Sequence, residues 1–193
     1  MMYALSDGLK YKVIACSSEL KAKQVYEEYR FLDPQTYLYP AKDLLFYQAD
    51  LRSKELLRQR MEVIQALAEE KPVTIVTSFD AFLDSLVPRE VISERFLRIQ
   101  NDSTLDLGEI QKRLTELGYD REVQIEGYGQ YAVRGGILDV YPLTEELPVR
   151  IEMWDEEVDS IRTFDVETQR SIENLTEISI CPAIEFPQEG ERR

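Results

Sequence analysis

The chain has 193 residues, 44% of them hydrophobic, which is enough for one large domain or two small ones with packed cores. It contains no histidine, which excludes a serine–histidine–aspartate triad and most zinc and haem sites. No apolar run reaches the ~18 residues of a membrane span and no secretory leader is visible, so we expect no membrane contact and a cytoplasmic location.

Acidic residues outnumber basic ones by 37 to 23, and the excess is unevenly placed. Residues 1–92 hold 12 Lys and Arg against 14 Asp and Glu, whereas residues 93–193 hold 11 against 23. Nucleic acids are bound by clustered cations that displace counterions from phosphates. The second half is therefore a poor candidate for DNA binding. It is better suited to a basic protein surface, or to a few isolated arginines with a specific use.

The first half alternates β-rich runs with helical patterns, which predicts a parallel, doubly wound α/β layer over residues 1–92. Ser17 and Ser18 can cap the first helix, and the run Val73–Thr77 is nearly continuous and apolar, as in a buried parallel strand. The expected strands are 11–16, 36–39 and 73–77, and the expected helices are 19–32, 55–69 and 79–86.

The second half changes to one helix and a series of short strands with tight turns, which is typical of a small α+β domain with an antiparallel sheet. Asp106 and Glu109 form a capping box at the expected helix start, and Gly118 suits a left-handed cap at its end. The boundary is expected near Ile92, giving domains 1–92 and 93–182 and a tail, 183–193, that leads back to the first domain. The expected strands are 96–99, 122–125, 131–134, 137–141, 149–154, 158–164 and 178–181.

An α/β layer raises the question of a nucleotide site, which needs a glycine-rich loop at a helix N-terminus. The string Gly-x-x-x-x-Gly-Lys-Ser/Thr is absent, and the first strand is followed by Cys16-Ser-Ser-Glu19, without glycine. We therefore expect no bound cofactor and no ATP binding by this chain.

The acidic run 152–159 could be a metal or acid/base cluster, but its spacing does not match a calcium loop. A solvated hairpin in which Glu152 faces Arg162 is the stronger interpretation, so we expect no metal site. Trp154 is expected to pack against the sheet. Cys16 and Cys181, far apart in the sequence, are expected to be reduced, buried thiols.

Arg134 precedes the turn Gly135-Gly136, between two strand-like runs. Such a turn can hold an arginine at a fixed angle on a rigid scaffold, ready for the carboxylate of a partner. The alternative is a surface arginine that pairs with one of the many nearby acids. The same two interpretations apply to Arg121, and the residues alone leave both open.

The same stretches carry a resemblance to a known family. Gly118-Tyr-Asp-Arg121, Tyr131-Ala-Val-Arg-Gly-Gly-Ile-Leu-Asp-Val-Tyr-Pro142 and Val149-Arg-Ile-Glu-Met-Trp154 resemble, in order, the N-terminal region of bacterial transcription-repair coupling factors. That region is itself similar to the excinuclease subunit UvrB. The resemblance covers essentially the whole chain and is strongest over residues 88–186.

Two departures from UvrB refine the resemblance. The segment from Tyr39 to Glu55 is too short for the DNA-gripping hairpin of UvrB, which favours the coupling factors. The α/β layer also lacks its first strand and helix, so we expect the chain to be a piece of a larger protein.

The resemblance implies a non-catalytic interaction module. In this family the small α+β domain docks UvrA, the damage-recognition subunit of nucleotide excision repair. The UvrA-contacting arginines match Arg121 and Arg134, and the neighbouring strand includes Leu138. Ala132 stands where UvrB has a further arginine, which puts a contact there in doubt. The α/β layer would be a helicase-like fold that has lost its nucleotide site.

The parent protein implied by the resemblance is an ATP-dependent DNA translocase. Its motor, its contacts with RNA polymerase and DNA, and a C-terminal domain that masks the UvrA surface would all lie outside these residues. Two other interpretations stay open: a UvrB-type fragment that contacts DNA or ATP directly, and a structural spacer whose arginines serve only solubility.

Overall fold

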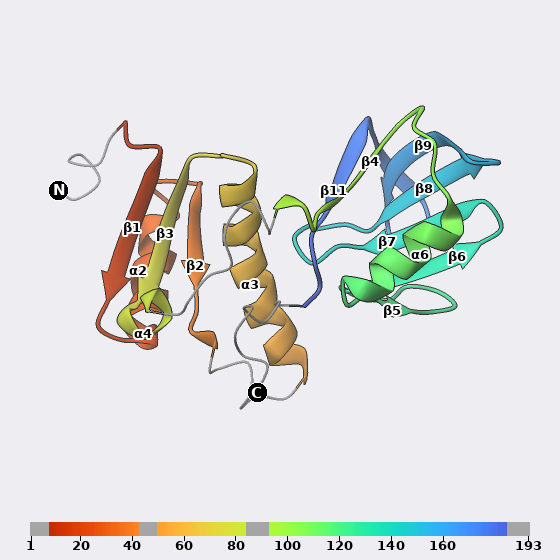
Figure 1. Ribbon diagram of the computed structural model, residues 1–193. Helices are drawn as coiled ribbons and strands as arrows, with labels where there is room; N and C mark the ends of the chain where they lie inside the picture. The colour runs from red at the N-terminus through yellow and green to blue at the C-terminus, as the bar shows by residue number, and fades with distance from the viewer. Residues whose placement is uncertain (1–7, 43–49, 84–92, 185–193) are drawn as a thin grey trace. The chain divides into compact units, whose positions relative to one another are not determined.

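A computed structural model of the chain describes residues 8–42, 50–83 and 93–184, with the side chains of residues 50–53 left aside. The chain divides into two compact units (Figure 1). The first unit includes the residues up to Glu94, and the second unit spans Arg95–Glu185. Parallel and antiparallel sheets are both present, which confirms the α/β class. The expected boundary at Ile92 and residues 185–193 of the expected tail lie outside the described residues, so the three-part division stays a prediction.

The first unit contains a three-stranded parallel sheet in the order β1-β3-β2. Its central strand is largely buried, which confirms the prediction of a buried parallel strand. The strands are β1 (Tyr11–Cys16), β2 (Thr36–Tyr39) and β3 (Val73–Ser78), and the helices are α2 (Glu19–Tyr29), α3 (Asp50–Ala68) and α4 (Phe79–Phe82).

The two longer helices of this unit pack on opposite faces of the sheet. Ala22 of α2 packs with Leu38 and Val76, whereas Val63 of α3 packs with Tyr39, the next residue of β2. Because neighbouring residues of a strand point to opposite faces, these contacts place one helix on each side. The sheet is therefore a middle layer between α2 and α3, as the sequence predicts.

Helix boundaries in this unit differ from the predictions by up to five residues. The first helix ends at Tyr29, not at residue 32, because Phe31 and Leu32 are exposed and further helix would bury nothing. Asp33 then fixes the turn: its carboxylate accepts hydrogen bonds from Lys12 (3.1 Å) and Thr74 (2.7 Å). The second helix, expected over 55–69, begins earlier, at Asp50. The helix expected over 79–86 is observed over Phe79–Phe82, and residues 84–92 lie outside the described residues.

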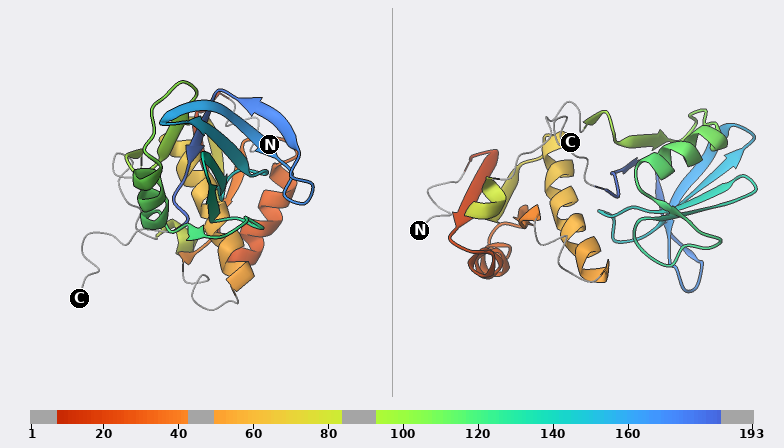
Figure 2. Two further views of the ribbon diagram at one scale, coloured as in Figure 1. Left: turned by 90° about the vertical axis from the view of Figure 1, so that its right-hand side faces the viewer. Right: turned by 60° about the horizontal axis from the view of Figure 1, so that its bottom comes forward.

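The second unit contains a six-stranded sheet in the order β10-β9-β8-β7-β6-β5 and one helix, α6 (Leu107–Glu116) (Figure 2). Its strand neighbours are antiparallel except β5 and β6, which are parallel. β4 and β11 form a separate antiparallel pair. The strands are β4 (Leu97–Gln100), β5 (Asp120–Arg121), β6 (Gln130–Arg134), β7 (Ile137–Tyr141), β8 (Val149–Trp154), β9 (Glu157–Phe164), β10 (Ser171–Leu175) and β11 (Glu177–Ile180).

Helix α6 has the caps that the sequence predicts. The Asp106 carboxylate accepts a hydrogen bond from the Glu109 backbone N–H at 2.9 Å. Gly118 has a φ of +86°, and a Cβ at this position would lie 2.3 Å from Ile184. Ile110 and Leu114 are buried, and the Thr115 hydroxyl lies 3.1 Å from that of Tyr131. The helix therefore covers the face of the sheet that carries Tyr131.

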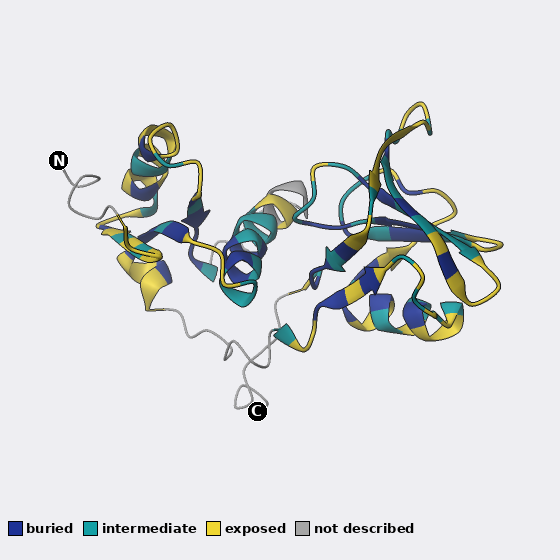
Figure 3. Cartoon of the chain, turned by 90° about the horizontal axis from the view of Figure 1, so that it is seen from above, coloured by how far each residue is buried: buried dark blue, intermediate teal, exposed yellow. Residues whose placement is uncertain are grey.

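Two predictions for this unit are wrong, and one of its strands, β10, was not predicted. No strand forms over 122–125; Ile125 is instead buried from a loop, beside Ala132. The edge strand β10 was not expected, because its exposed residues show no apolar alternation. Trp154 does not pack against the sheet but is 82% exposed, beside the β8–β9 turn. Figure 3 colours the chain by exposure, with buried residues in dark blue and exposed residues in yellow, and both kinds occur among the strands.

Candidate partner-binding surface

The turn between β6 and β7 carries Arg134 and depends on both of its glycines. Gly135 has a φ of +61°, in the left-handed region that favours glycine. A Cβ at Gly136 would lie 2.7 Å from the Met153 carbonyl oxygen, and the Met153 N–H donates to the Gly136 carbonyl at 2.8 Å. This turn is thus fastened to β8, which makes it a rigid support for the arginine before it.

The Arg134 side chain is anchored at one end and exposed at the other. Its Nη2 donates to Oδ2 of Asp139 at 2.8 Å, yet 45% of the side chain remains exposed. Asp139 lies opposite Ala132 in the register, so the contact is a diagonal cross-strand pair. Arg134 therefore pairs with a local acid and also faces solvent, so both interpretations of this residue describe part of its geometry.

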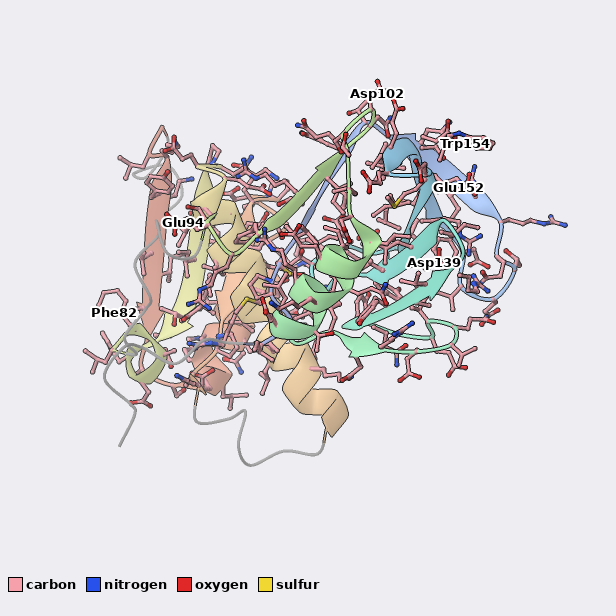
Figure 4. All side chains as sticks on the ribbon, turned by 45° about the vertical axis from the view of Figure 1, so that its right-hand side comes forward. Phe82, Glu94, Asp102, Asp139, Glu152 and Trp154 are labelled. Carbon is pink, nitrogen blue, oxygen red and sulfur yellow. The ribbon has the colours of Figure 1, made fainter. Side chains whose placement is uncertain are left out.

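Asp139, which is labelled in Figure 4, is buried and held mainly by Arg150, which the register places directly opposite it on β8. Arg150 donates from Nε to Oδ1 at 2.7 Å and from Nη2 to Oδ2 at 2.9 Å. Its guanidinium carbon also lies 4.3 Å from the centre of the Phe164 ring. The hydrogen bonds to Asp139 raise the pKa of Arg150, although burial works in the opposite direction.

Sequence reasoning missed this buried pair, although a signal was present. Asp139 interrupts an otherwise apolar strand, and a lone acid in such a strand needs a partner when the strand is buried. Alternation in β8 also puts Arg150 on one face of its strand. Only the register, however, brings the two residues opposite each other.

Arg121 is exposed and lies on β5, where the register aligns it with Tyr131. It therefore shares the face of Tyr131, whereas Arg134, three residues further along β6, faces the other way. The structure places the two arginines on neighbouring strands without bringing them into one cluster.

Leu138 and Ala132 lie in the core of the unit. Leu138 has no exposed surface, so its expected role as a partner contact is corrected to support of β7 from behind. Ala132 is 1% exposed and packs with Ile125 and Phe164. No direct contact with a partner is available to either side chain in this structure.

The acidic run has the expected hairpin geometry. Arg162 donates to the Glu152 carboxylate across β8 and β9, which confirms the predicted pair. Among residues 8–42, 50–83 and 93–184, no group of three histidine, cysteine or acidic residues could hold a metal ion. In that same part of the chain, no helix is long and apolar enough to cross a membrane. Cys16 and Cys181 are free and buried, as predicted.

The carboxyl ends of β1, β2 and β3 form the edge at which parallel α/β sheets bind nucleotides. Here the carboxylate of Glu19, in the first turn of α2, lies across this edge. It accepts a hydrogen bond from the Ala41 backbone N–H at 3.2 Å, just after β2, and another from the Ser78 hydroxyl at the end of β3. These donors are thus engaged by a side chain of the chain itself.

Comparison with known protein families identifies the kind of domain that the second unit forms. Residues 97–186 match the family model of the UvrB interaction domain. This range includes the Arg134 turn and the Asp139–Arg150 pair, together with α6 and all strands of the six-stranded sheet.

Relatives of known function extend the match to most of the chain. It is 40% identical over 163 residues to the transcription-repair-coupling factor of Bacillus subtilis, covering 83% of this chain and 14% of that protein. The coupling factors of Staphylococcus haemolyticus and Staphylococcus aureus are 36% and 34% identical, over 79% and 81% of this chain and 13% of theirs. Over about four fifths of its length the chain is thus similar to part of the transcription-repair coupling factors, and it spans about one seventh of these relatives' length.

Proposed function

We propose that this chain is a non-catalytic interaction module that recruits UvrA to sites of transcription-coupled nucleotide excision repair. One observation carries the proposal: a half-exposed arginine, Arg134, stands at the end of a rigid hairpin within a match to the UvrB interaction domain. An arginine held in this way suits recognition of a carboxylate on a protein partner.

The contact surface is centred on Arg134 and the β6–β7 turn. Arg121 at the β5 edge adds a second, separate contact, and Leu138 supports the strand without touching the partner. The second half of the chain has the net charge of −12 derived from its composition, which suits a protein partner better than DNA.

In the parent protein this module would work beside domains that the chain does not contain. By analogy with the family, those domains would include an ATP-dependent DNA translocase, a site for RNA polymerase and a C-terminal domain that masks the UvrA surface. A bacterial cytoplasmic setting belongs to the same proposal. Direct contact of this chain with DNA or ATP gains no support, because Glu19 lies across the sheet edge where a nucleotide would bind.

The decisive experiment is a calorimetric titration of purified UvrA against the 193-residue chain and its Arg134→Ala variant. We expect the variant to bind at least about tenfold more weakly, because a partner carboxylate would lose its bidentate donor. Its thermal unfolding should change little, because Asp139 keeps both of its hydrogen bonds to Arg150.

The matched control is Arg98→Ala, which removes an exposed arginine from β4 of the same unit and should leave the affinity unchanged. Equal affinity of the wild-type chain and Arg134→Ala would refute the assignment of the surface. Absence of UvrA binding by the folded wild-type chain would refute the proposed function itself.

A further inference from the structure

The carboxylate of Asp139 is shared by two arginines of very different exposure. The exposed fractions of the side chains are 2% for Asp139, 13% for Arg150 and 45% for Arg134. Arg150 contacts both carboxylate oxygens, whereas Arg134 reaches only Oδ2, through a single nitrogen. Arg150, the less exposed of the two arginines, is thus the principal counter-ion of Asp139, and Arg134 makes a single additional hydrogen bond to it.

This division leaves a positive charge at the surface. One acid and two arginines carry a net charge of +1, and the bidentate Arg150 compensates Asp139 at short range. The hydrogen bond from Arg134 to Asp139 uses one of the five N–H groups of its guanidinium. The remaining donors and the excess charge are available to a group outside the chain.

The position of Asp139 is fixed without help from Arg134. Arg150 also donates from Nη2 to the Gln169 side-chain oxygen at 2.8 Å and lies over the fully buried Phe164 ring. Gln169 is held in turn, because its side-chain nitrogen donates to the Val166 carbonyl at 2.7 Å. Asp139 on β7, which anchors Arg134, is therefore supported by residues of β8, β9 and the loop that follows β9.

We infer that the Asp139–Arg150 pair is a positioning device, which holds the Arg134 guanidinium in one orientation while leaving its charge available for a carboxylate of the partner. Ordering a mobile arginine on binding costs conformational free energy, and an arginine that is already ordered in the free protein does not incur this cost. Asp139 and Arg150 thus raise affinity without touching the partner. The identity of the partner rests on the proposed function, whereas the positioning of Arg134 does not.

The test removes both charges of the pair at once. The double variant Asp139→Asn/Arg150→Gln keeps the net charge of the chain, so long-range attraction to UvrA stays the same and no buried charge is left alone. We expect UvrA to bind this variant about tenfold more weakly in a calorimetric titration. In an Arg134→Ala background the same double substitution should cause no further loss, because the pair acts only through Arg134.

The matched control is Lys112→Gln/Glu116→Gln, which removes an exposed ion pair of α6, on the other side of the sheet from Arg134, again without a change in net charge. It should leave the affinity within about twofold of wild type, since rim charges away from the contact contribute little. A loss equal to that of the test variant would refute positioning by Asp139 and Arg150, as would a loss that persists without Arg134.

A second measurement does not need UvrA. Nitrogen-15 relaxation of the Arg134 Nε–Hε group reports the order of its side chain in the free protein. We expect this group to be ordered in the wild-type chain and in the control, and mobile in Asp139→Asn/Arg150→Gln. An equally ordered Arg134 in all three would refute the inference even if UvrA binds, whereas failure of UvrA to bind the wild-type chain would refute the proposed function alone.

Discussion

At the scale of single residues, Gly135 and Gly136 support Arg134 for different physical reasons. Gly135 needs a left-handed backbone but has open space around its Cα. Gly136 has an ordinary backbone but no room, because a Cβ would meet the Met153 carbonyl oxygen. Asparagine tolerates a left-handed φ, so it can replace Gly135 at little cost. At Gly136 any side chain would collide with the Met153 carbonyl oxygen.

Substitutions at the two positions should therefore differ in effect. We expect Gly136→Ala to lower the free energy of unfolding by about 1–3 kcal/mol, because β8 must shift to admit the Cβ. Gly135→Asn should cost less than about 1 kcal/mol. Chemical denaturation followed by circular dichroism measures both, and equal destabilisation by the two substitutions would contradict the steric account.

The candidate site was predictable from the sequence only in part. The Gly-Gly pair located the turn and hence Arg134, since turn residues act through local conformation. Asp139 and Arg150 were not predicted as partners, because their contact depends on how β7 and β8 are aligned. The burial of Leu138 was not predicted for a similar reason: only the packed sheet shows that β7 is covered on both faces.

At the scale of elements, prediction succeeded for elements whose own sequence contains capping residues or an apolar pattern. It failed for strands that form only because a neighbouring strand pairs with them. Helix α6 has an N-cap at Asp106, an apolar stripe and Gly118 at its end, and all three are confirmed. Strand β10 is exposed except at the half-buried Leu175, and it forms by pairing with β9. Strand β5 has two residues, too few for any periodic pattern.

The loop between α2 and β2 is held by Asp33, which links it to β1 and β3. Burial raises the pKa of Asp33, but hydrogen bonds from Thr74, Lys12 and the Gln35 N–H outweigh it and hold the pKa below its ordinary 3.8. Because the folded-state pKa is depressed, this stabilisation is present above pH ~4 and is lost as the pH falls through the folded value.

The variant Asp33→Asn tests this link. We expect it to lower the free energy of unfolding by about 1.5–3 kcal/mol at pH 7, the range for hydrogen bonds to charged groups. The difference from wild type should shrink as the pH falls below about 4. The control Glu27→Gln, at an exposed position of α2, should show neither effect. A constant difference between pH 7 and pH 2 would contradict the assignment.

At the scale of the whole molecule, each unit contains one buried thiol. Cys16 is 7% exposed in the first unit and Cys181 is fully buried in the second, and burial raises the pKa of both thiols. A buried, protonated thiol reacts slowly with alkylating reagents until its surroundings open. The two cysteines thus report separately on the opening of the two cores.

Pulsed alkylation in increasing denaturant, read by mass spectrometry, should therefore resolve the two units. We expect Asp33→Asn to move the labelling transition of Cys16 to lower denaturant and leave that of Cys181 in place. Gly136→Ala should do the reverse, because it strains only the second sheet. Coincident shifts of both transitions in either variant would show one cooperative unit in place of two.

Besides accepting hydrogen bonds, the carboxylate of Glu19 places a negative charge at the carboxyl edge of the parallel sheet. It is an anion that the chain carries to the place where a parallel sheet usually receives a phosphate. An incoming phosphate would meet negative charge and find the Ala41 and Ser78 donors already engaged. The first unit thus bridges the carboxyl edge of its own parallel sheet with a tethered carboxylate.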